Sequence, residues 1–419
     1  MSSIVSNSSS MPSQQEPSLL YTLIGLANLG NTCFLNSILQ CLRLNPAIAS
    51  IFVRPGGMRL RTDAPVAPLV TAFQTLMRDF WRVTPPANTN PTMVPRGFFQ
   101  ILKTTLVDTD VYWYTPGQQS DAGEAIQYLL DSLHEGLFFE PTMNIKGYAT
   151  TPEEASQIRA IEAWMNSWSN KVPGAYKKGY SPIVRNFYGQ TITCIQCDTC
   201  KNVSEQFQPW AVLKVPIPGA DVIGAGAPDI DACLREAFHQ DTIPDYSCTE
   251  CNKRAGTKDE RSVATRFDRL SKVPPVLFLQ YKRTIFIKER AAQTKVRCKI
   301  ACDLDKVDLT PYMAYSRNPF TNELISDVPP IYEVSAIVEQ MGSAQGGHYI
   351  CYVRQKDQWV EYDDSTTTPV DASRVNTQDS YILMLTLKRE VPEDTRQFEA
   401  DILAYRASLP PPVEEPSPA

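Results

Sequence analysis

The pattern of apolar and polar positions along the chain changes near residue 183. Before that point, apolar residues recur at helical spacing. A first run, after Asn31-Thr32 as a possible cap, comprises Phe34, Leu35, Ile38, Leu39 and Leu42. A second run comprises Ala122, Ala125, Ile126, Leu129, Leu130 and Leu133. Asp121 and Glu124 stand as cap and third residue of that second helix, a variant of the capping box. Residues 158–168 predict a further helix.

From about residue 183 onward the apolar runs are short and typical of strands. Predicted strands cover residues 210–217, 276–281, 332–338, 348–354 and 381–387. Helices first and strands afterwards indicate an α+β fold, in which a helical lobe packs against a mostly antiparallel sheet.

The two ends of the chain differ from the rest in composition. Residues 1–18 are rich in Ser, Gln and Pro, so we expect a disordered tail over about residues 1–20. In residues 389–419 we expect a short helix and then an extended Pro/Glu-rich tail. The residues that predict this helix are Phe398, Ile402, Leu403 and Tyr405. We favour the interpretation that both tails are merely exposed to solvent over the interpretation that they have a docking role.

Composition narrows the class of protein. The chain has 419 residues, 43% of them hydrophobic, and a formal net charge of -6, which argues against a nucleic-acid binder. It has neither an apolar run long enough for a membrane span nor a secretory h-region at its start. We therefore expect no membrane partner and a cytoplasmic or nuclear location. In such a reducing compartment, the eleven cysteines are better interpreted as metal ligands or nucleophiles than as disulfides.

Cys33 is the first candidate for a catalytic residue. It follows a Gly- and Asn-rich loop and falls at the start of the first predicted helix. The unpaired backbone N–H groups there favour an anion, so we expect the thiolate of Cys33 to be stabilised. A buried structural cysteine is the alternative for this residue, and it is the ordinary interpretation of Cys41.

Of the three histidines, His348 has the best setting for a base. We expect His134 on the surface of a helix, and His239 near a pair of cysteine motifs. His348 follows two glycines and begins a strand. A turn near residues 355–358 and a returning strand would bring Asp363 beside His348, where a carboxylate would hold the imidazole and complete a nucleophile–base–orienter set.

Four further cysteines have the spacing of a metal site. Cys197-x-x-Cys200 and Cys248-x-x-Cys251 form two knuckles, and four thiolates in this arrangement suit a structural tetrahedral Zn²⁺. Cys194 lies three residues before Cys197, which leaves a second ligand register open. Unliganded cysteines at the tips of two hairpins are the alternative.

These features together resemble the ubiquitin-specific protease family of deubiquitinating enzymes. The longest matches are residues 25–42, around Cys33, and residues 332–370, around His348. Shorter matching blocks are Asp121-Ala-Gly-Glu, Phe187-Tyr-Gly, and residues 273–283, 307–312 and 380–383. Their order is the family's order, over roughly residues 23–388, which is a highly specific signal.

The resemblance implies a papain-like cysteine protease fold in a catalytic domain over residues 21–388. Its parts would be a helical thumb at about 21–180, zinc-ribbon fingers at about 185–262 and a palm of antiparallel sheet at about 263–388. The implied activity is thiol-dependent hydrolysis of the isopeptide or peptide bond after the C-terminal Gly of ubiquitin. Ubiquitin and ubiquitinated proteins would be the partners, no catalytic cofactor would be needed, and the oligomeric state is left open.

The resemblance also implies roles for single residues. Cys33 would be the nucleophile, His348 the base and Asp363 the orienting residue, with Asp364 as a secondary candidate. Asn28 matches the family's oxyanion-hole Asn, where its amide and the Cys33 backbone N–H could stabilise the tetrahedral intermediate. A simple role in the loop turn is the alternative for Asn28.

On the substrate side, Asp121 and Glu124 match acids that meet the arginines of the ubiquitin tail. Helix capping is the competing interpretation, and one residue can serve both roles. Gly346 and Gly347 would flank the narrow slot that admits only glycine before the cleaved bond. In the fingers, the family match at Ser204 and Phe207 favours Cys197 and Cys200 over the register that uses Cys194.

The sequence departs from the family pattern at a few positions. Ser120 and Gly123 replace a Gln and a His of the family's Gln-Gln-Asp-Ala-His-Glu, and Gln280-Tyr281 stand where His-Leu is common. These departures bear on substrate affinity more than on chemistry. They leave two alternatives within the family: a catalytically weak ubiquitin-binding scaffold, or a protease for a ubiquitin-like modifier. The alternative from another class is a zinc-ribbon interaction protein in which Cys33 and His348 are structural.

Overall fold

The computed structural model describes most of the chain between residues 23 and 409. The described ranges are 23–82, 91–108, 118–140, 145, 148–168, 179–219, 227–257, 259–287, 292–343, 346–388 and 393–409. The tail expected at residues 1–20 and the Pro/Glu-rich end at 410–419 lie outside them. The boundaries drawn above between thumb, fingers and palm stay predictions.

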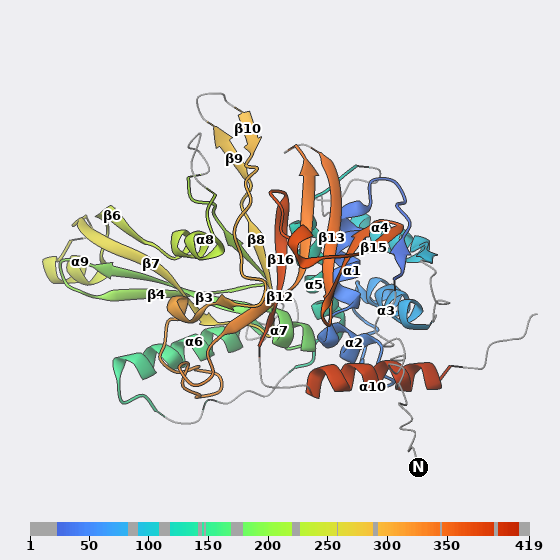
Figure 1. Cartoon of the computed structure of the whole chain (residues 1–419). Helices are drawn as coiled ribbons and strands as arrows, with labels where there is room; N and C mark the ends of the chain where they lie inside the picture. The colour runs from blue at the N-terminus through green and yellow to red at the C-terminus, as the bar shows by residue number, and fades with distance from the viewer. Residues whose placement is uncertain are drawn as a thin grey trace, which may run out of the picture.

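A helical lobe occupies one side of the molecule (Figure 1). Its helices are α1 (Cys33–Arg43), α2 (Pro46–Phe52), α3 (Ala67–Arg82), α4 (Arg96–Asp108), α5 (Ala122–Leu137) and α7 (Pro182–Phe187), with the short strands β1 (Gly25–Leu26) and β2 (Thr92–Met93). The helix starts predicted at Cys33 and Ala122 are confirmed. Asp121 caps α5 through a bond of 3.0 Å from the Glu124 backbone N–H. Thr32 occupies the N-cap of α1 but makes no side-chain capping bond.

The large sheet forms the centre of the molecule. Its order is β15 (Thr366–Val370), β14 (Gln358–Asp363), β13 (Gly347–Gln355), β12 (Ile331–Gly342), β16 (Ser380–Leu387), β8 (Val276–Tyr281) and β5 (Val212–Val215), and β11 (Val307–Asp308) also pairs with β12. All pairs are antiparallel except β5 with β8. Four of the five predicted strands are confirmed, while the one at 210–217 is split. The chain leaves one sheet after Trp210 and enters the other at Val212, with Ala211 buried at the crossing.

Both faces of the large sheet are buried. Because side chains alternate along a strand, Ile382 and Met384 of β16 pack on the helical lobe, while Leu383 and Leu385 pack in a second core on the opposite face. The mostly apolar character of β16 and β8 in the sequence follows from this position between two cores. The sheet is therefore a rigid platform for residues carried on β12, β13 and β14.

A smaller sheet projects away from the helical lobe (Figure 1). Its order is β4 (Val203–Trp210), β3 (Gly189–Cys197), β7 (Ser262–Lys272) and β6 (Gln240–Tyr246), with α9 (Thr249–Ala255) at its tip and α8 (Ile230–Ala237) near its base. Helix α6 (Pro152–Trp168) confirms the helix predicted at 158–168 and lies along β4. An ion pair of 2.6 Å between Arg159 and Glu205 ties α6 to this sheet.

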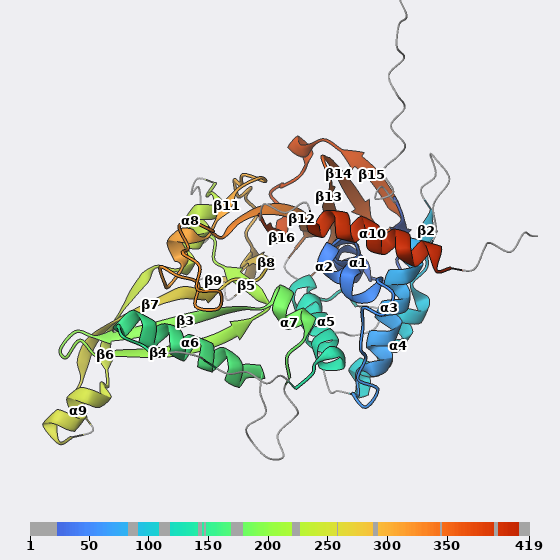
Figure 2. The same cartoon turned by 90° about the horizontal axis from the view of Figure 1, so that it is seen from below.

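Two further elements complete the described fold. The hairpin of β9 (Thr284–Ile287) and β10 (Ala292–Lys295) extends from the end of β8. Helix α10 (Glu393–Ala407), which confirms the short helix expected near the C-terminus, packs against α2 and α3 (Figure 2). Arg54 and Asp401 join α10 to the helical lobe at 2.8 Å. None of the helices in the described part of the chain has both the length and the apolar character needed to cross a membrane.

Candidate active site

The loop before α1 is shaped by its own asparagine and glycine residues. Gly30 and Asn31 have φ of 98° and 55°, a backbone region that favours these residue types. The Asn28 side-chain oxygen accepts bonds of 3.0 Å from the Gly30 N–H and 3.1 Å from the Thr32 N–H. This turn sets Cys33 at the first position of α1, where it is 3% exposed.

The thiol of Cys33 is not the stabilised thiolate that its helix position predicted. Burial is the main cause that raises the pKa of Cys33, and the negative charge of Asp364 raises it further. Hydrogen bonds from the Tyr349 backbone, the Gln119 side chain and the Phe34 backbone act in the opposite direction without reversing the result. The backbone at the start of α1 therefore lowers the pKa of Cys33, but burial raises this pKa by more in the free protein.

Gln119 is a contact of the thiol that the sequence analysis did not identify. Its Nε2 lies 3.6 Å from Cys33 Sγ and donates to the Gly347 carbonyl at 2.7 Å. Its Oε1 accepts from the Gly347 N–H at 2.5 Å. The side-chain amide thus pairs with both backbone groups of Gly347, as an extended peptide would. The signal in the sequence was its place two residues before Asp121.

His348 meets Asp363 through the predicted hairpin. Strands β13 and β14 pair with a turn at residues 356–357, and His348 Nε2 lies 2.6 Å from Asp363 Oδ1. With the proton of a neutral imidazole on Nε2, Nδ1 is left to accept another proton. The next residue, Tyr349, bonds to the Cys33 thiol through its backbone, so Cys33 and His348 lie on adjoining elements, α1 and β13.

Asp364 binds to the loop and helix of Cys33, and not to the histidine ring. Its Oδ2 accepts from Asn28 Nδ2 at 2.8 Å, and its Oδ1 accepts from Asn36 Nδ2 at 2.7 Å. Its backbone carbonyl accepts from the Leu26 N–H at 2.7 Å. Asn36 was missed by the sequence analysis because that analysis followed the apolar positions of α1, whereas Asn36 is one of several buried polar residues of this helix. The oxyanion role of Asn28 stays a prediction, since the contacts shown here hold the loop.

The acids expected to meet the substrate tail lie at the start of α5. Asp121 caps the helix and also accepts a bond of 2.5 Å from the Tyr381 hydroxyl. Burial raises the pKa of Glu124, as does Asp121, while Lys214 opposes the shift. A pocket runs beside these acids between α5 and β5. Its lining comprises Gly123, Glu124, Gln127, Tyr128, Asp131, Val212 and Lys214.

Two departures from the family pattern touch each other. A Cβ on Gly123 would lie 2.4 Å from Gln280 Oε1, so the Gln280 amide fills the space left by the missing side chain. Gln280 Nε2 also donates to the Tyr381 hydroxyl at 2.5 Å, and that hydroxyl donates to Asp121. The two unusual residues therefore act as one unit that supports Asp121.

Gly347 is the first residue of β13 and pairs with Gly342 of β12, and Gly346 comes directly before it. A Cβ on Gly347 would approach the Met341 carbonyl oxygen to 1.7 Å, which no side chain can accept. A Cβ on Gly346 would meet only Gln119 Oε1, at 3.6 Å. The close approach of β12 thus requires glycine at position 347, whereas packing does not require glycine at position 346.

The other two histidines lie away from this site. The expectation that His134 is on the surface is wrong: it is half-buried, with Nδ1 2.8 Å from Ser181 Oγ and its ring against Trp168. Burial, helped by the charge of Arg61, lowers the pKa of His134 to about 4. His239 is exposed on the smaller sheet, 2.7 Å from Asp241.

The four knuckle cysteines come together at the tip of the smaller sheet. The Sγ atoms of Cys197, Cys200, Cys248 and Cys251 all lie within 4.8 Å of one another. Cys197 and Cys251 are 3.7 Å apart, and Cys200 and Cys248 are 3.5 Å apart. With a Zn–S bond of about 2.3 Å, the edge of a ZnS₄ tetrahedron is about 3.8 Å. The donor set therefore fits a tetrahedral zinc ion.

Cys194 is not a member of this group within the described residues. It pairs with Glu205 inside the sheet, and burial together with that carboxylate raises the pKa of the Cys194 thiol to about 11. The described geometry therefore favours the register that uses Cys197 and Cys200.

Comparison with known proteins gives a consistent result. A family model described as ubiquitin carboxyl-terminal hydrolase matches residues 24–385. Ubiquitin carboxyl-terminal hydrolase 2 of Rattus norvegicus is 27% identical, over 87% of this chain and 54% of the relative. The Gallus gallus protein of that name is 26% identical, over 90% of this chain and 96% of the relative. The chain spans about half the length of the rat and human relatives that it matches.

Among solved structures, the SAGA DUB module (Ubp8, Sgf11, Sus1 and Sgf73) bound to monoubiquitin contains a chain with the same fold. The TM-score is 0.60 at 20% identity, and the match covers 87% of this chain and 69% of that chain. This likeness confirms the predicted fold class, with its helical lobe, central sheet and projecting smaller sheet.

Proposed function

Because the chain belongs to the ubiquitin carboxyl-terminal hydrolase family, we propose that it is a cysteine-type deubiquitinase. It would hydrolyse the isopeptide or peptide bond after the C-terminal Gly of ubiquitin. One observation carries the assignment of the residues: His348 lies 2.6 Å from Asp363, while the backbone of the next residue, Tyr349, bonds to the Cys33 thiol. A nucleophile, a base and an orienting carboxylate on adjoining elements are what acyl transfer needs.

In the proposed mechanism, Cys33 begins as a thiol, because burial and Asp364 raise its pKa. His348 accepts the thiol proton as the sulfur attacks the carbonyl carbon of the C-terminal Gly. Asp363 stabilises the imidazolium that forms. Collapse of the tetrahedral intermediate breaks the C–N bond, and His348 returns the proton to the leaving amine. Water then hydrolyses the thioester with His348 as base, which releases the ubiquitin carboxylate and restores the thiol.

The oxyanion of the intermediate would be held by the Cys33 backbone N–H and Asn28 Nδ2. Support for the second donor is that Nδ2 already points to the active-site side of the loop, toward Asp364 at 2.8 Å. An amide carries two N–H groups, so one can hold Asp364 while the other meets the oxyanion. Removing one such donor costs about 3 kcal/mol of transition-state stabilisation in related chemistry.

The substrate tail would run beside α5 toward Cys33. The acids Asp121 and Glu124 support this path because an arginine-rich peptide would pair with them. At the end of the path, the substrate backbone would replace the Gln119 amide, which now pairs with Gly347. Gly346 would then border the slot for the terminal glycines.

A structural zinc ion on Cys197, Cys200, Cys248 and Cys251 is part of the proposal. It would clamp β3 to α9 and thereby fix the tip of the smaller sheet. It would have no role in bond cleavage. A cytoplasmic or nuclear location stays a prediction, which imaging of the tagged full chain would test.

The proposed function is tested by turnover of ubiquitin conjugates. Purified protein is incubated with di-ubiquitin and with ubiquitin carrying a fluorogenic C-terminal amide, alongside the Cys33→Ala variant. We expect cleavage by the wild type and none by the variant, with both samples folded by circular dichroism. A folded wild type that cleaves neither substrate contradicts the proposal, and cleavage of a ubiquitin-like modifier alone would reassign the substrate.

A further inference from the structure

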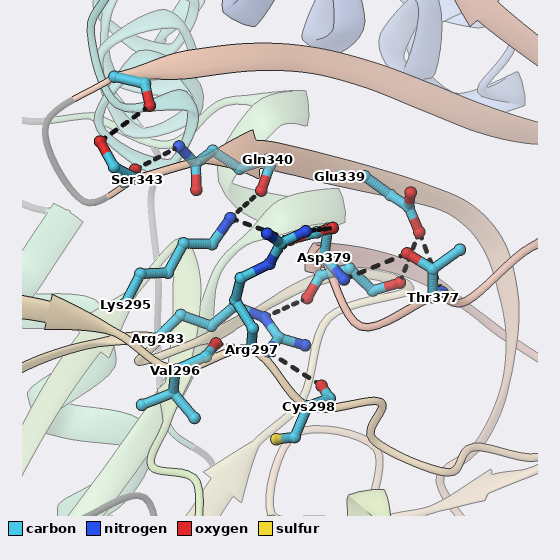
Figure 3. Close-up of polar contacts among 12 residues, drawn as sticks. Arg283, Lys295, Val296, Arg297, Cys298, Glu339, Gln340, Ser343, Thr377 and Asp379 are labelled. Atoms are coloured by element: carbon cyan, nitrogen blue, oxygen red, sulfur yellow. Dashed lines mark hydrogen bonds and ion pairs between the residues drawn. The ribbon is translucent and has the colours of Figure 1, made fainter.

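A largely buried cluster of charged side chains joins the loop before β16 to the end of β12 (Figure 3). At its centre is Asp379, 6% exposed, in the loop before β16. Arg297 donates to both of its carboxylate oxygens, at 3.0 and 2.7 Å, and Lys295 donates to Oδ1 at 3.2 Å. Burial opposes ionisation, but the two cations hold the pKa of Asp379 below its usual value. The carboxylate is therefore charged and fixed.

Lys295 makes a second contact that Arg297 does not. Its Nζ also donates to the backbone carbonyl of Gln340, on β12. The Gln340 backbone N–H donates to the Asp379 carbonyl at 3.0 Å. Lys295 is almost completely buried, with a side chain that is 5% exposed, whereas the Arg297 side chain is 48% exposed. The two cations thus share one carboxylate, but Lys295 alone joins it to β12.

The position of Gln340 explains why this link matters. The pairing of β12 with β16 ends at Glu339 and Ser380, one residue before Gln340. In an antiparallel ladder, the N–H and carbonyl of one residue point to the same side. On that side no strand of the described chain pairs with Gln340, and the Asp379 carbonyl and the Lys295 ammonium take the places of strand partners. Lys295 and Asp379 thereby extend the sheet edge beyond its last strand pair.

From Gln340 a short path of hydrogen bonds reaches the active site. Gln340 Nε2 donates to the Ser343 carbonyl at 3.0 Å, and the Ser343 N–H donates to the Gly346 carbonyl at 2.8 Å. Gly347 follows, with Gln119 on its backbone. On the strand itself, Met341 pairs directly with His348. The end of β12 therefore holds His348 in place through strand pairing.

We propose that Lys295, held by Asp379, is a positioning residue for His348. It fixes the last residues of β12, which pair with the start of β13, so that His348 is held in place beside Cys33 and Asp363. The proposal rests on the proposed function for its effect on catalysis. Its structural part, the order of residues 341–343 and 346–347, can be measured without turnover.

The test compares Lys295→Met with Arg297→Met. Each removes one cation from Asp379, but only the first removes the bond to Gln340. For Lys295→Met we expect kcat on the fluorogenic ubiquitin substrate to fall about tenfold, with KM within about twofold. Arg297→Met should keep kcat within about twofold of wild type. Lys295→Arg restores a donor to the Gln340 carbonyl oxygen and to Asp379 Oδ1, so it should recover most of kcat.

Hydrogen exchange separates this proposal from the proposed function. Lys295→Met should speed amide exchange about tenfold or more at Ser343 and Gly347, and leave the β14 amides unchanged. If wild type is inactive but this exchange difference appears, the proposed function fails and the support of the turn stands. If wild type is active, two results would overturn the proposal. One is a Lys295→Met variant whose kcat and amide exchange match those of wild type. The other is an Arg297→Met variant that loses as much kcat as Lys295→Met does.

A variant further along the path covers the case in which Lys295→Met does not fold. Gln340→Met keeps the backbone bonds of β12 and removes the donor to the Ser343 carbonyl. We expect a severalfold fall in kcat with faster exchange at Ser343 and Gly347. Wild-type behaviour of this variant in both measurements contradicts the path.

Discussion

Asp363 and Asp364 are neighbours in the sequence, yet they hold the two halves of the candidate active site. The Asp363 carboxylate lies 2.6 Å from His348 Nε2, while the Asp364 carboxylate accepts from Asn28 and Asn36, on the loop and helix of Cys33. Asp364 has φ of 49°, and this left-handed residue ends β14 and turns the second carboxylate toward α1. One dipeptide thus contacts both His348 and the loop and helix of Cys33.

The two carboxylates therefore predict different consequences of neutralisation. Asp363→Asn removes the charge that stabilises the imidazolium, so we expect kcat to fall by about 10²–10⁴, with little change in thermal stability. Asp364→Asn removes a charge that raises the pKa of Cys33, so the pKa should fall. It also loses one bond to an asparagine, at about 1 kcal/mol of stability. Steady-state kinetics and thermal unfolding measure both variants, and equal kcat losses would contradict this division of roles.

Substitution of Gln119 and of Asp364 should shift the pH dependence of Cys33 alkylation by iodoacetamide in opposite directions. Because burial raises the pKa of Cys33, the alkylation rate of wild type should reach half its maximum at a higher pH than that of an ordinary thiol. Gln119→Leu removes a bond that lowers the pKa, so its midpoint should move up. The midpoint of Asp364→Asn should move down. Shifts in the same direction for both variants would show that the Cys33 environment is different from the one described.

The two glycines before His348 should differ in what their substitution affects. Gly347→Ala drives a Cβ into the Met341 carbonyl oxygen, so we expect a loss of about 2 kcal/mol or more and a lower Tm. Gly346→Ala meets only the Gln119 side chain, so its Tm should match wild type. If Gly346 borders the substrate slot, its KM for the fluorogenic ubiquitin substrate should rise severalfold. An unchanged KM would remove Gly346 from the slot.

Zinc removal should affect the smaller sheet before the active site. We expect one equivalent of zinc in the purified protein by elemental analysis, and its loss in Cys251→Ser. Cys194→Ser, three residues before Cys197 but outside the cluster, is the matched control and should keep the metal. Chelation should lower Tm and open β3 and α9 to proteolysis, because metal binding contributes folding free energy. Less than half an equivalent in wild type contradicts the zinc assignment.

Local patterns predicted the elements that carry the candidate site. The apolar spacing after Thr32 gave α1 with Cys33 at its first turn, and alternation after His348 gave the hairpin that returns Asp363 to the ring. Both depend on neighbours in sequence, within one helix or one hairpin. Chemistry that needs only such short-range geometry can be predicted from one sequence.

Contacts between distant segments could not be predicted in this way. Gln119 reaches Gly347 across 228 residues, and Lys295 reaches Asp379 across 84. The pKa of Cys33 depends on how much of the thiol the packed sheet covers, which a helix pattern does not contain. His134 was placed wrongly for the same reason, because Trp168 of α6 and Ser181 before α7, which contact its ring, lie far from it in the sequence.

The central claim is that Cys33 is a nucleophile for the C-terminus of ubiquitin. Ubiquitin with a C-terminal vinyl or propargyl electrophile, incubated with wild type and with Cys33→Ala, tests it most directly. We predict a covalent adduct with wild type that maps to Cys33 by mass spectrometry, and none with the variant. A folded, zinc-loaded wild type that forms no adduct, or an adduct on another cysteine, would contradict the account.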